Sequence, residues 1–164
     1  MSVAIICLVI SGICDLFDGT VARTKKNRTD DEKMFGIQID SLCDVISFGV
    51  FPAIISYNLG VDGTIGMIVN VLYCLCAVIR LAFFNVLEDK RQKTEDSCNK
   101  TYHGLPVTTI ALILLVVYLC KGIFKEAIFV VILGVVMAIT SFLFILDFEF
   151  KKPRLINQEK ISVK

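Results

Sequence analysis

The stretch CDLFDGTVAR, from Cys14 to Arg23, puts two aspartates, a glycine and an arginine directly after thirteen residues that carry no charge. An apolar run of roughly 20 residues is enough for a helix to cross a lipid bilayer. Ionisable residues at the end of such a helix are costly to bury, and they indicate a functional site by default. The stretch therefore predicts a membrane helix that ends in a site for chemistry or transport.

The composition favours the same class of protein. Of the 164 residues, 55% are hydrophobic, and the mean hydropathy of +0.74 is too high for an ordinary soluble domain of this size. We predict an all-α fold, a polytopic membrane helical bundle with one domain at residues 1–150 and a cytoplasmic tail at 151–164. The five predicted spans run near Ser2–Ala22, Phe35–Leu59, Gly63–Leu87, Leu105–Cys120 and Glu126–Leu146.

The basic residues predict the orientation of these spans. They gather after the first span, after the third span and in the tail: Arg23, Lys25, Lys26, Arg28, Lys33; Lys90, Arg91, Lys93, Lys100; Lys151, Lys152, Arg154, Lys160 and Lys164. The positive-inside rule puts these three segments in the cytoplasm. Met1 would then lie outside, with no polar flank before the first span. We expect that an earlier span, entering from the cytoplasm, is missing from this chain.

Four aspartates are spaced so that they can meet. Asp15 and Asp18 share a helix face at spacing i, i+3, and Asp40 and Asp44 share one at spacing i, i+4. The charged connection at residues 24–33 joins their two spans as an antiparallel hairpin, which brings both pairs to the same depth. Four neighbouring anions repel strongly, so we expect a cation to neutralise them. The alternative is that these aspartates cap helices or lie at the membrane interface.

Oxygen ligands without histidine or cysteine favour a hard cation, Mg²⁺ or Mn²⁺, and four carboxylates are enough for a site with two such ions. Small residues beside the aspartates, Gly19, Ala22 and Gly36, clear space for a ligand to approach the backbone. Arg23 offers a planar donor fork that suits phosphate. The combination indicates a pyrophosphate site at the membrane surface.

The order Asp15-x2-Asp18-Gly19-x2-Ala22-Arg23, followed by Gly36-x3-Asp40-x3-Asp44, resembles the signature of the CDP-alcohol phosphotransferase family. This resemblance implies a fold of six spans, two divalent cations and a homodimer. It also implies that an alcohol hydroxyl attacks the β-phosphate of a CDP-linked lipid and that CMP is released.

The resemblance also implies roles for individual residues. The metal ligands would be Asp15, Asp18, Asp40 and Asp44, with Asp44 also the general base. Gly19 and Arg23 match positions that contact the CDP moiety. Thr29 stands where the family often has a serine or threonine near the nucleotide, although the twelve-residue spacer between Arg23 and Gly36 is longer than usual.

Three later stretches resemble the phosphatidylserine synthases of the bacterial and archaeal membrane type. They are SFGVFPA at Ser47–Ala53, IRLAFFNV at Ile79–Val86 and HGLPVTTIAL at His103–Leu112. The acceptor would then be L-serine, and the reaction would transfer a phosphatidyl group from CDP-diacylglycerol to it. One position departs from that pattern, because Phe83 stands where such enzymes often have a second basic residue.

Three residues are candidates for binding the acceptor. Arg80 lies within the third span, where a guanidinium is costly unless it faces a site. It would hold the serine carboxylate or the lipid phosphate, or else extend to the cytoplasmic interface. Asn85 would orient the same ligand, or else hydrogen-bond a helix end. His103, the one histidine of the chain, precedes Gly104 and Pro106, which shape the entry into the fourth span.

Three other functions remain open: transfer to another acceptor, cation transport, and an inactive paralogue or fragment that acts as a membrane partner. Glycerol 3-phosphate or an inositol phosphate could replace serine as the acceptor, although these more anionic compounds would need more basic residues near the site. A divalent-cation transporter would use the carboxylates as a site at the middle of the membrane. Against transport, the aspartates fall at the ends of the predicted spans, and the sequence shows no inverted repeat.

Overall fold

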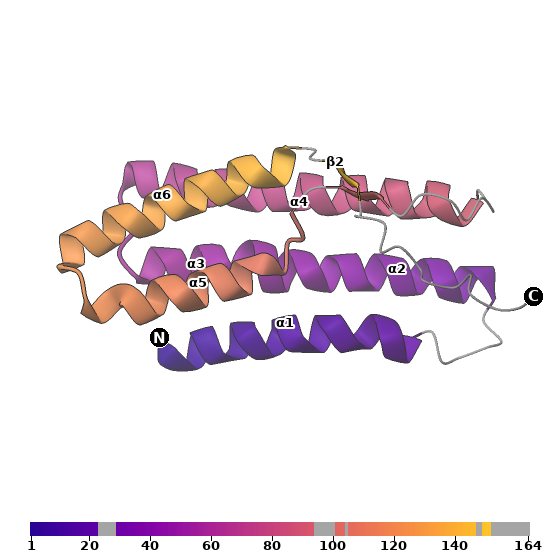
Figure 1. Ribbon diagram of the computed structural model, residues 1–164, viewed down its shortest axis with the longest axis horizontal. Coiled ribbons are helices and arrows are strands. Elements are labelled where there is room, and N and C mark those ends of the chain that lie inside the picture. Colours follow the sequence, from indigo (N-terminus) through magenta and orange to yellow (C-terminus); the bar gives the residue numbers. More distant parts are fainter. Residues whose placement is uncertain (23–28, 94–100, 104, 147–148, 152–164) are drawn as a thin grey trace, which may run out of the picture.

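The chain folds into long helices that lie side by side along one common axis (Figure 1). This computed structural model describes residues 1–22, 29–93, 101–103, 105–146 and 149–151. The elements are α1 (Ser2–Ala22), α2 (Asp30–Asp44), η1 (Val45–Val50), α3 (Phe51–Asn58), α4 (Thr64–Lys93), β1 (Thr101–His103), α5 (Thr109–Leu119), η2 (Cys120–Gly122), α6 (Glu126–Ile145) and β2 (Glu149–Lys151). The predicted all-α helical bundle is confirmed.

The five predicted spans correspond to these helices, with one of them built from three elements. Helix α2 continues through the π-helical turn η1 into α3 without a break, and Met34–Asn58 forms one apolar stretch of 25 residues. In the described part of the chain, Met34–Asn58, Thr64–Leu87 and Glu126–Ile145 are long and apolar enough to cross a membrane. Ser2–Phe17 and Thr109–Gly122 are shorter apolar helices.

The surface of the bundle is apolar, as expected for a protein that lies in lipid. Large aliphatic side chains such as Val3, Ile65 and Ile123 are each more than 70% exposed. A soluble protein rarely leaves so many apolar side chains in contact with water. The buried side chains instead fill the space between helices, with Leu133 and Met137 of α6 packed in one cluster with Tyr73 of α4. The described helices therefore form the core of an integral membrane protein.

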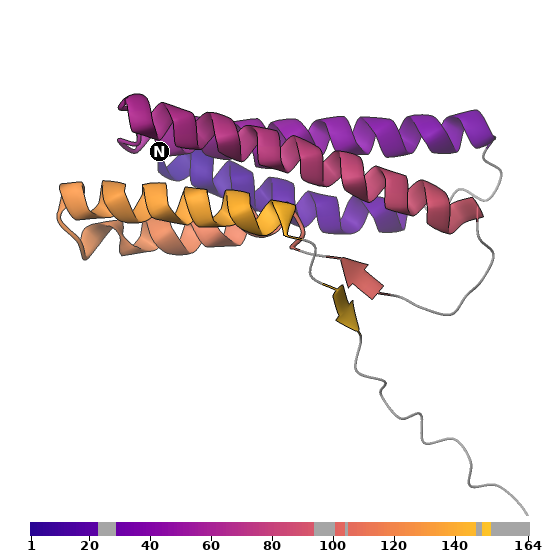
Figure 2. The same ribbon diagram turned by 90° about the horizontal axis from the view of Figure 1, so that it is seen from above.

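Two short strands pair beside the bundle (Figure 2). Strands β1 and β2 are antiparallel, with Thr101 opposite Lys151 and His103 opposite Glu149. Sequence analysis did not predict this pairing, because strands of three residues are too short to show an alternating pattern. The pairing links the segment before α5 to the segment after α6.

The first turn of α4 approaches the backbone of the preceding connection so closely that only glycine fits there. A Cβ atom on Gly66 would lie 2.6 Å from the carbonyl oxygen of Val61 and 2.7 Å from its carbonyl carbon. The same carbonyl oxygen accepts a hydrogen bond of 3.1 Å from Nδ2 of Asn70, which is buried. The first two turns of α4 therefore contact the carbonyl group of Val61, through Gly66 and Asn70.

We expect Gly66→Ala to destabilise the protein by about 1–3 kcal/mol, the usual cost of forcing an extra carbon into a packed site. The obstacle is backbone, which cannot rotate away as a flexible side chain can. Thermal unfolding of the purified protein in detergent measures the effect.

Gly63→Ala is the matched control, since a Cβ atom there would meet nothing within 4 Å. Its melting temperature should stay close to that of the unchanged protein. Equal melting temperatures for the two variants would contradict the proposed close approach.

Candidate active site

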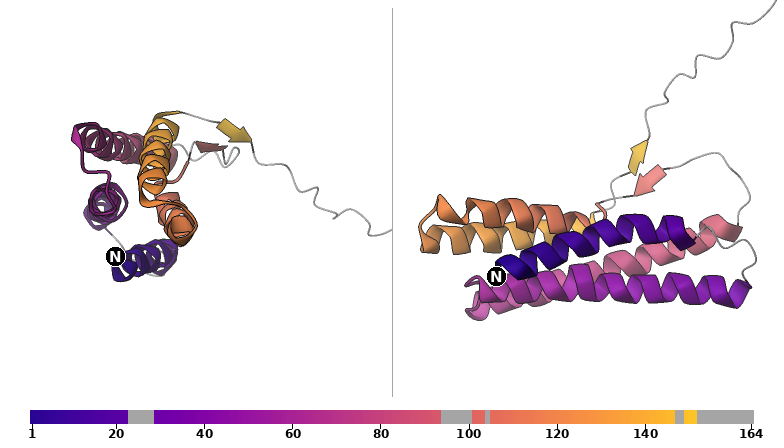
Figure 3. Two further views of the ribbon diagram at one scale, coloured as in Figure 1. Left: turned by 90° about the vertical axis from the view of Figure 1, so that its left-hand side faces the viewer. Right: turned by 90° about the horizontal axis from the view of Figure 1, so that it is seen from below.

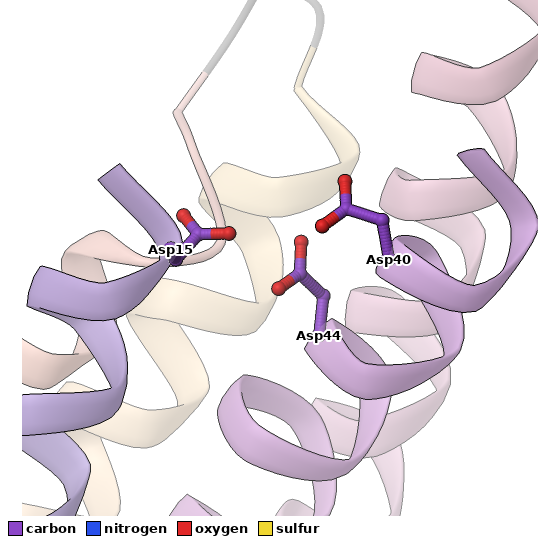
Figure 4. Close-up of side chains that lie close together, drawn as sticks. All are labelled: Asp15, Asp40 and Asp44. Carbon is purple, nitrogen blue, oxygen red and sulfur yellow. The ribbon is translucent and has the colours of Figure 1, made fainter. Parts of the chain in front are cut away.

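Three carboxylates from two helices meet partway along the bundle, beside the C-terminal end of α2. Asp15 lies on α1, and Asp40 and Asp44 lie on α2; one oxygen of each falls within 4.8 Å of the other two. Their side chains point toward one another across the space between the helices (Figure 4). Asp15 and Asp44 are half-buried, whereas Asp40 is exposed. The structure therefore brings together three of the four aspartates predicted to bind metal, while the side chain of Asp18 lies outside the described residues.

This group of carboxylates can hold a metal ion. Two like charges about 4 Å apart near a protein surface repel by about 4 kcal/mol, so a cation bound between them relieves a real cost. The three donors are all carboxylate oxygens, and oxygen-only sites favour Mg²⁺ or Mn²⁺ over the softer transition metals. The donor chemistry of the described residues fits the cation predicted from the sequence.

The start of α2 is held by a capping box, which sets where the acidic helix begins. Thr29 Oγ1 accepts a hydrogen bond of 3.2 Å from the backbone N–H of Glu32, and the backbone N–H of Thr29 donates to Glu32 Oε2 at 3.2 Å. Such reciprocal bonds stabilise a helix N-terminus. The hydroxyl hydrogen of Thr29 is not used in either bond, so Thr29 can cap the helix and still donate to a phosphate.

The candidate residues for CDP-lipid binding are only partly described. Gly19 and Ala22 belong to the last part of α1, although their surroundings are not among the described features. Arg23 lies outside the described residues. Gly36 lies on α2, one turn before Asp40, and a Cβ atom there would meet nothing within 4 Å. Packing within the chain therefore does not require glycine at this position, and the space beside it is open.

Arg80 is buried in the bundle at 6% exposure, and its Nε donates a hydrogen bond of 3.3 Å to the carbonyl oxygen of Leu105. This burial contradicts the alternative in which the side chain extends to the membrane interface. The residue also lines a cavity of about 200 Å³, together with Ile79, Phe83, Phe144 and Ile145. The guanidinium therefore lies in an apolar pocket between α4 and α6.

Asn85 contacts a different neighbour. Its Oδ1 accepts a hydrogen bond of 2.8 Å from Ser41 Oγ, which also lies 3.0 Å from the carbonyl oxygen of Ile37. Ser41 stands between Asp40 and Asp44 in the sequence, so this bond ties α4 to the acidic helix. Asn85 and Arg80 thus bond to separate parts of the fold. The side chain of His103, on β1, lies outside the described residues.

The residues that hold α2 and η1 against α4 were not predicted from the sequence. The position of Ser41 between two candidate metal ligands was the available indication that it supports the site. Tyr73 donates a hydrogen bond of 2.5 Å to the carbonyl oxygen of Phe48 in the π turn η1. The signal for this irregular turn was Pro52, because proline within a helix removes a backbone donor.

The fold and the site together define a polytopic helical membrane protein with a carboxylate cluster between two of its helices. Residues 1–146 match the CDP-alcohol phosphatidyltransferase family. The chain belongs to this family, as its two-helix signature predicted. No solved structure matches the chain.

Three relatives illustrate where the chain falls within the family. It is 36% identical over 131 residues to a CDP-diacylglycerol–serine O-phosphatidyltransferase of Saccharomyces cerevisiae, covering 72% of this chain and 46% of that protein. It is 38% identical over 144 residues to an archaetidylserine synthase of Methanothermobacter thermautotrophicus, covering 86% and 57%. It is 38% identical over 141 residues to the CDP-diacylglycerol–serine O-phosphatidyltransferase of Helicobacter pylori strain 26695, covering 79% and 55%. The chain spans about half the length of these curated relatives.

Proposed function

We propose that this protein transfers a phosphatidyl group from CDP-diacylglycerol to the hydroxyl of L-serine, giving phosphatidylserine and CMP. The observation that carries the proposal is the meeting of Asp15, Asp40 and Asp44 within 4.8 Å in a chain of this family. The names of the relatives support serine as the acceptor, because the yeast and Helicobacter proteins are both named for transfer to serine.

Two divalent cations, Mg²⁺ or Mn²⁺, would be held by Asp15, Asp40 and Asp44 together with Asp18. Asp18 falls three residues after Asp15, so the two share a face of α1. When bound, such cations supply Lewis acidity and positive charge to the pyrophosphate and to the departing CMP. The carboxylates of the chain hold this charge at a fixed place between α1 and α2.

Asp44 is the proposed general base. Its half-buried carboxylate faces the other two acids, where the serine hydroxyl would arrive. In the reaction the serine oxygen forms a bond to the β-phosphorus, the bond from that phosphorus to the CMP oxygen breaks, and the hydroxyl proton passes to Asp44. Phosphorus keeps its oxidation state, and CMP leaves with the electron pair of the broken bond.

The nucleotide end of CDP-diacylglycerol would contact Gly19, Ala22, Arg23, Thr29 and Gly36. The open space beside Gly36 supports this assignment, since it lies one helical turn from Asp40. Thr29, at the start of the same helix, retains a hydroxyl hydrogen for a phosphate oxygen. Arg23 follows α1 directly and would pair with the nucleotide phosphates as a planar donor.

The acceptor would be bound by Arg80, Asn85 and His103. The position of Arg80 beside a cavity of about 200 Å³ supports this assignment, because the cavity gives an anionic ligand room next to a guanidinium donor. Glycerol 3-phosphate and inositol phosphate carry more negative charge than serine and would need more basic residues near the site. Among the described residues, Arg80 is the one arginine or lysine that lines this cavity.

The same proposal includes the setting of the enzyme. The distribution of lysine and arginine supports an active site that faces the cytoplasm, with residues 1–150 as the catalytic membrane domain and 151–164 as a cytoplasmic tail. A homodimer is the proposed assembly, on the resemblance to the family alone.

We expect purified protein, supplied with CDP-diacylglycerol and Mn²⁺ or Mg²⁺, to release CMP only when L-serine is added. Parallel reactions with glycerol 3-phosphate and with inositol phosphate test the two rival acceptors. Release with one of these and not with serine would keep the transferase and overturn the choice of acceptor.

Reconstitution into liposomes separates the transferase from a cation transporter. The proposed transferase keeps its cations between α1 and α2, so we expect no uptake of Mn²⁺ into liposomes that contain the protein. Mn²⁺ uptake without serine-dependent CMP release would overturn the proposed function.

A further inference from the structure

The long helix that carries Asp40 and Asp44 changes its geometry directly after them. Residues Val45–Val50 form a π turn, in which the backbone N–H of Phe51 donates to the carbonyl oxygen of Ile46, five residues earlier. Pro52 explains why an ordinary α turn is absent. It has no N–H to donate to the carbonyl of Phe48, four residues earlier, and its ring would clash with that carbonyl.

The π turn decides which face of the following helix points into the bundle. It accommodates one residue more than an α turn, so the residues beyond it are rotated back about the axis. In an uninterrupted α-helix, Ser56 would lie about 120° around the axis from Asp44; with the extra residue absorbed, this angle falls to about 20°. Ser56 is fully buried. The buried face of α3 and the acidic face of α2 therefore point the same way only because of this turn.

Helix α4 holds the π turn in place. The hydroxyl of Tyr73 donates to the carbonyl oxygen of Phe48 at 2.5 Å, and Cys74 Sγ donates a longer bond of 3.5 Å to the carbonyl oxygen of Gly49. The two helices are in contact here, since a Cβ atom on Gly49 would lie at an ordinary van der Waals distance of 3.5 Å from Cβ of Ala77. An unsatisfied carbonyl is costly inside a membrane, so these bonds stabilise the irregular geometry.

The side chain of Tyr73 is held in one position by its packing, so it can support the π turn. Its side chain is fully buried, and its ring packs against that of Phe144 on α6, with 5.7 Å between the ring centres. On the other side of Asp44, Asn85 of the same helix accepts the hydrogen bond of Ser41. Helix α4 therefore bonds to the helix that carries Asp40 and Asp44 at two places, one before Asp44 in the sequence and one after it.

We infer that Tyr73 is a positioning residue for the metal site: its hydroxyl holds the π turn and so sets the rotation at which α2 presents Asp40 and Asp44 to Asp15. This inference rests on the proposed metal-dependent transfer. Tyr73 would contact neither substrate nor metal. It acts on the position of Asp40 and Asp44 through its hydrogen bond to the carbonyl oxygen of Phe48.

The test is the affinity of Tyr73→Phe for Mn²⁺, measured by the spin-resonance signal of free Mn²⁺ during titration. Removing a residue that orients metal ligands typically weakens metal binding 10- to 100-fold, and we expect a loss of about tenfold here. The concentration of Mn²⁺ giving half-maximal CMP release should rise by the same factor. A merely structural role would lower the yield of folded protein without changing the affinity of the protein that remains.

Tyr118→Phe is the matched control. It also removes a tyrosine hydroxyl that bonds between helices, because Tyr118 Oη lies 2.9 Å from Ser2 Oγ. Ser2 is at the other end of α1 from Asp15, roughly 20 Å away at 1.5 Å per residue, so the affinity for Mn²⁺ should not change.

The phenylalanine variant keeps the ring that packs against Phe144, and its fold is checked by thermal unfolding. If it does not accumulate, Cys74→Ala is titrated instead, with a smaller shift expected in the same direction. Unchanged Mn²⁺ affinity in the variant that folds would overturn the inference. Failure of the unchanged protein to bind Mn²⁺ would instead overturn the proposed metal site, which keeps the two failures distinct.

Discussion

Asp44→Asn should lose catalytic activity almost completely while the protein still binds CDP-diacylglycerol. Asparagine has nearly the same shape and keeps an oxygen that can face a cation, but its amide does not accept a proton at neutral pH. A positioned general base contributes about 100- to 10,000-fold to a rate, so kcat for serine-dependent CMP release should fall by a factor in that range. The role is assigned to Asp44 from the resemblance to the family, and its half-buried carboxylate, facing Asp15 and Asp40, is compatible with it.

Three measurements separate loss of the base from loss of the site. Steady-state CMP release gives kcat, Mn²⁺ titration gives metal binding, and retention of labelled CDP-diacylglycerol gives lipid binding. The matched control is Asp62→Asn, which removes an exposed aspartate from the connection between α3 and α4 and should leave kcat unchanged. Full activity of Asp44→Asn would remove this residue from the mechanism.

Asp15→Asn should reduce the stabilisation that Mn²⁺ gives to the fold. Asp15 is the described contribution of α1 to the carboxylate group, and Asp40 and Asp44 both come from α2. A cation bound between them would link the two helices, and a ligand present at 100 times its dissociation constant stabilises a fold by about 2.7 kcal/mol. The unchanged protein should therefore melt at a higher temperature with Mn²⁺ than without it, and the variant should show a smaller difference.

The experiment compares thermal unfolding of each protein in detergent with Mn²⁺ and after treatment with a chelator. Asp31→Asn is the matched control, because this exposed aspartate lies on α2 near its N-terminus and outside the carboxylate group. The control should keep the full shift with Mn²⁺. A shift of normal size in Asp15→Asn would show that α1 does not contribute to metal binding through this residue.

Local sequence patterns predicted most of the helices of the bundle, which the left view of Figure 3 shows end-on. Each helix is long and apolar, and hydrophobicity over a window of that length is a strong local signal. The segment Glu126–Leu146, for example, was predicted within one residue of α6, Glu126–Ile145. The spacing of Asp40 and Asp44 also placed both on one face of α2 without knowledge of any neighbour.

The irregular features escaped prediction because their causes are shared between distant residues. Pro52 by itself signals only a disturbed helix. The form of the disturbance depends on Tyr73 of α4, which is 21 positions later in the chain and donates to the carbonyl of Phe48. The pairing of Thr101–His103 with Glu149–Lys151 likewise depends on two segments that approach only after the helices have packed.

The amino-acid sequence by itself determined the membrane class, the helical segments, the candidate carboxylates and the family, because each depends on residue type and short spacing. Only the tertiary structure decided that Asp15 meets Asp40 and Asp44, that Arg80 is buried beside a cavity, and that Asn85 binds Ser41. These outcomes follow from how whole helices pack. The rotation and height of one helix against another are set by many side chains at once, and no local pattern encodes them.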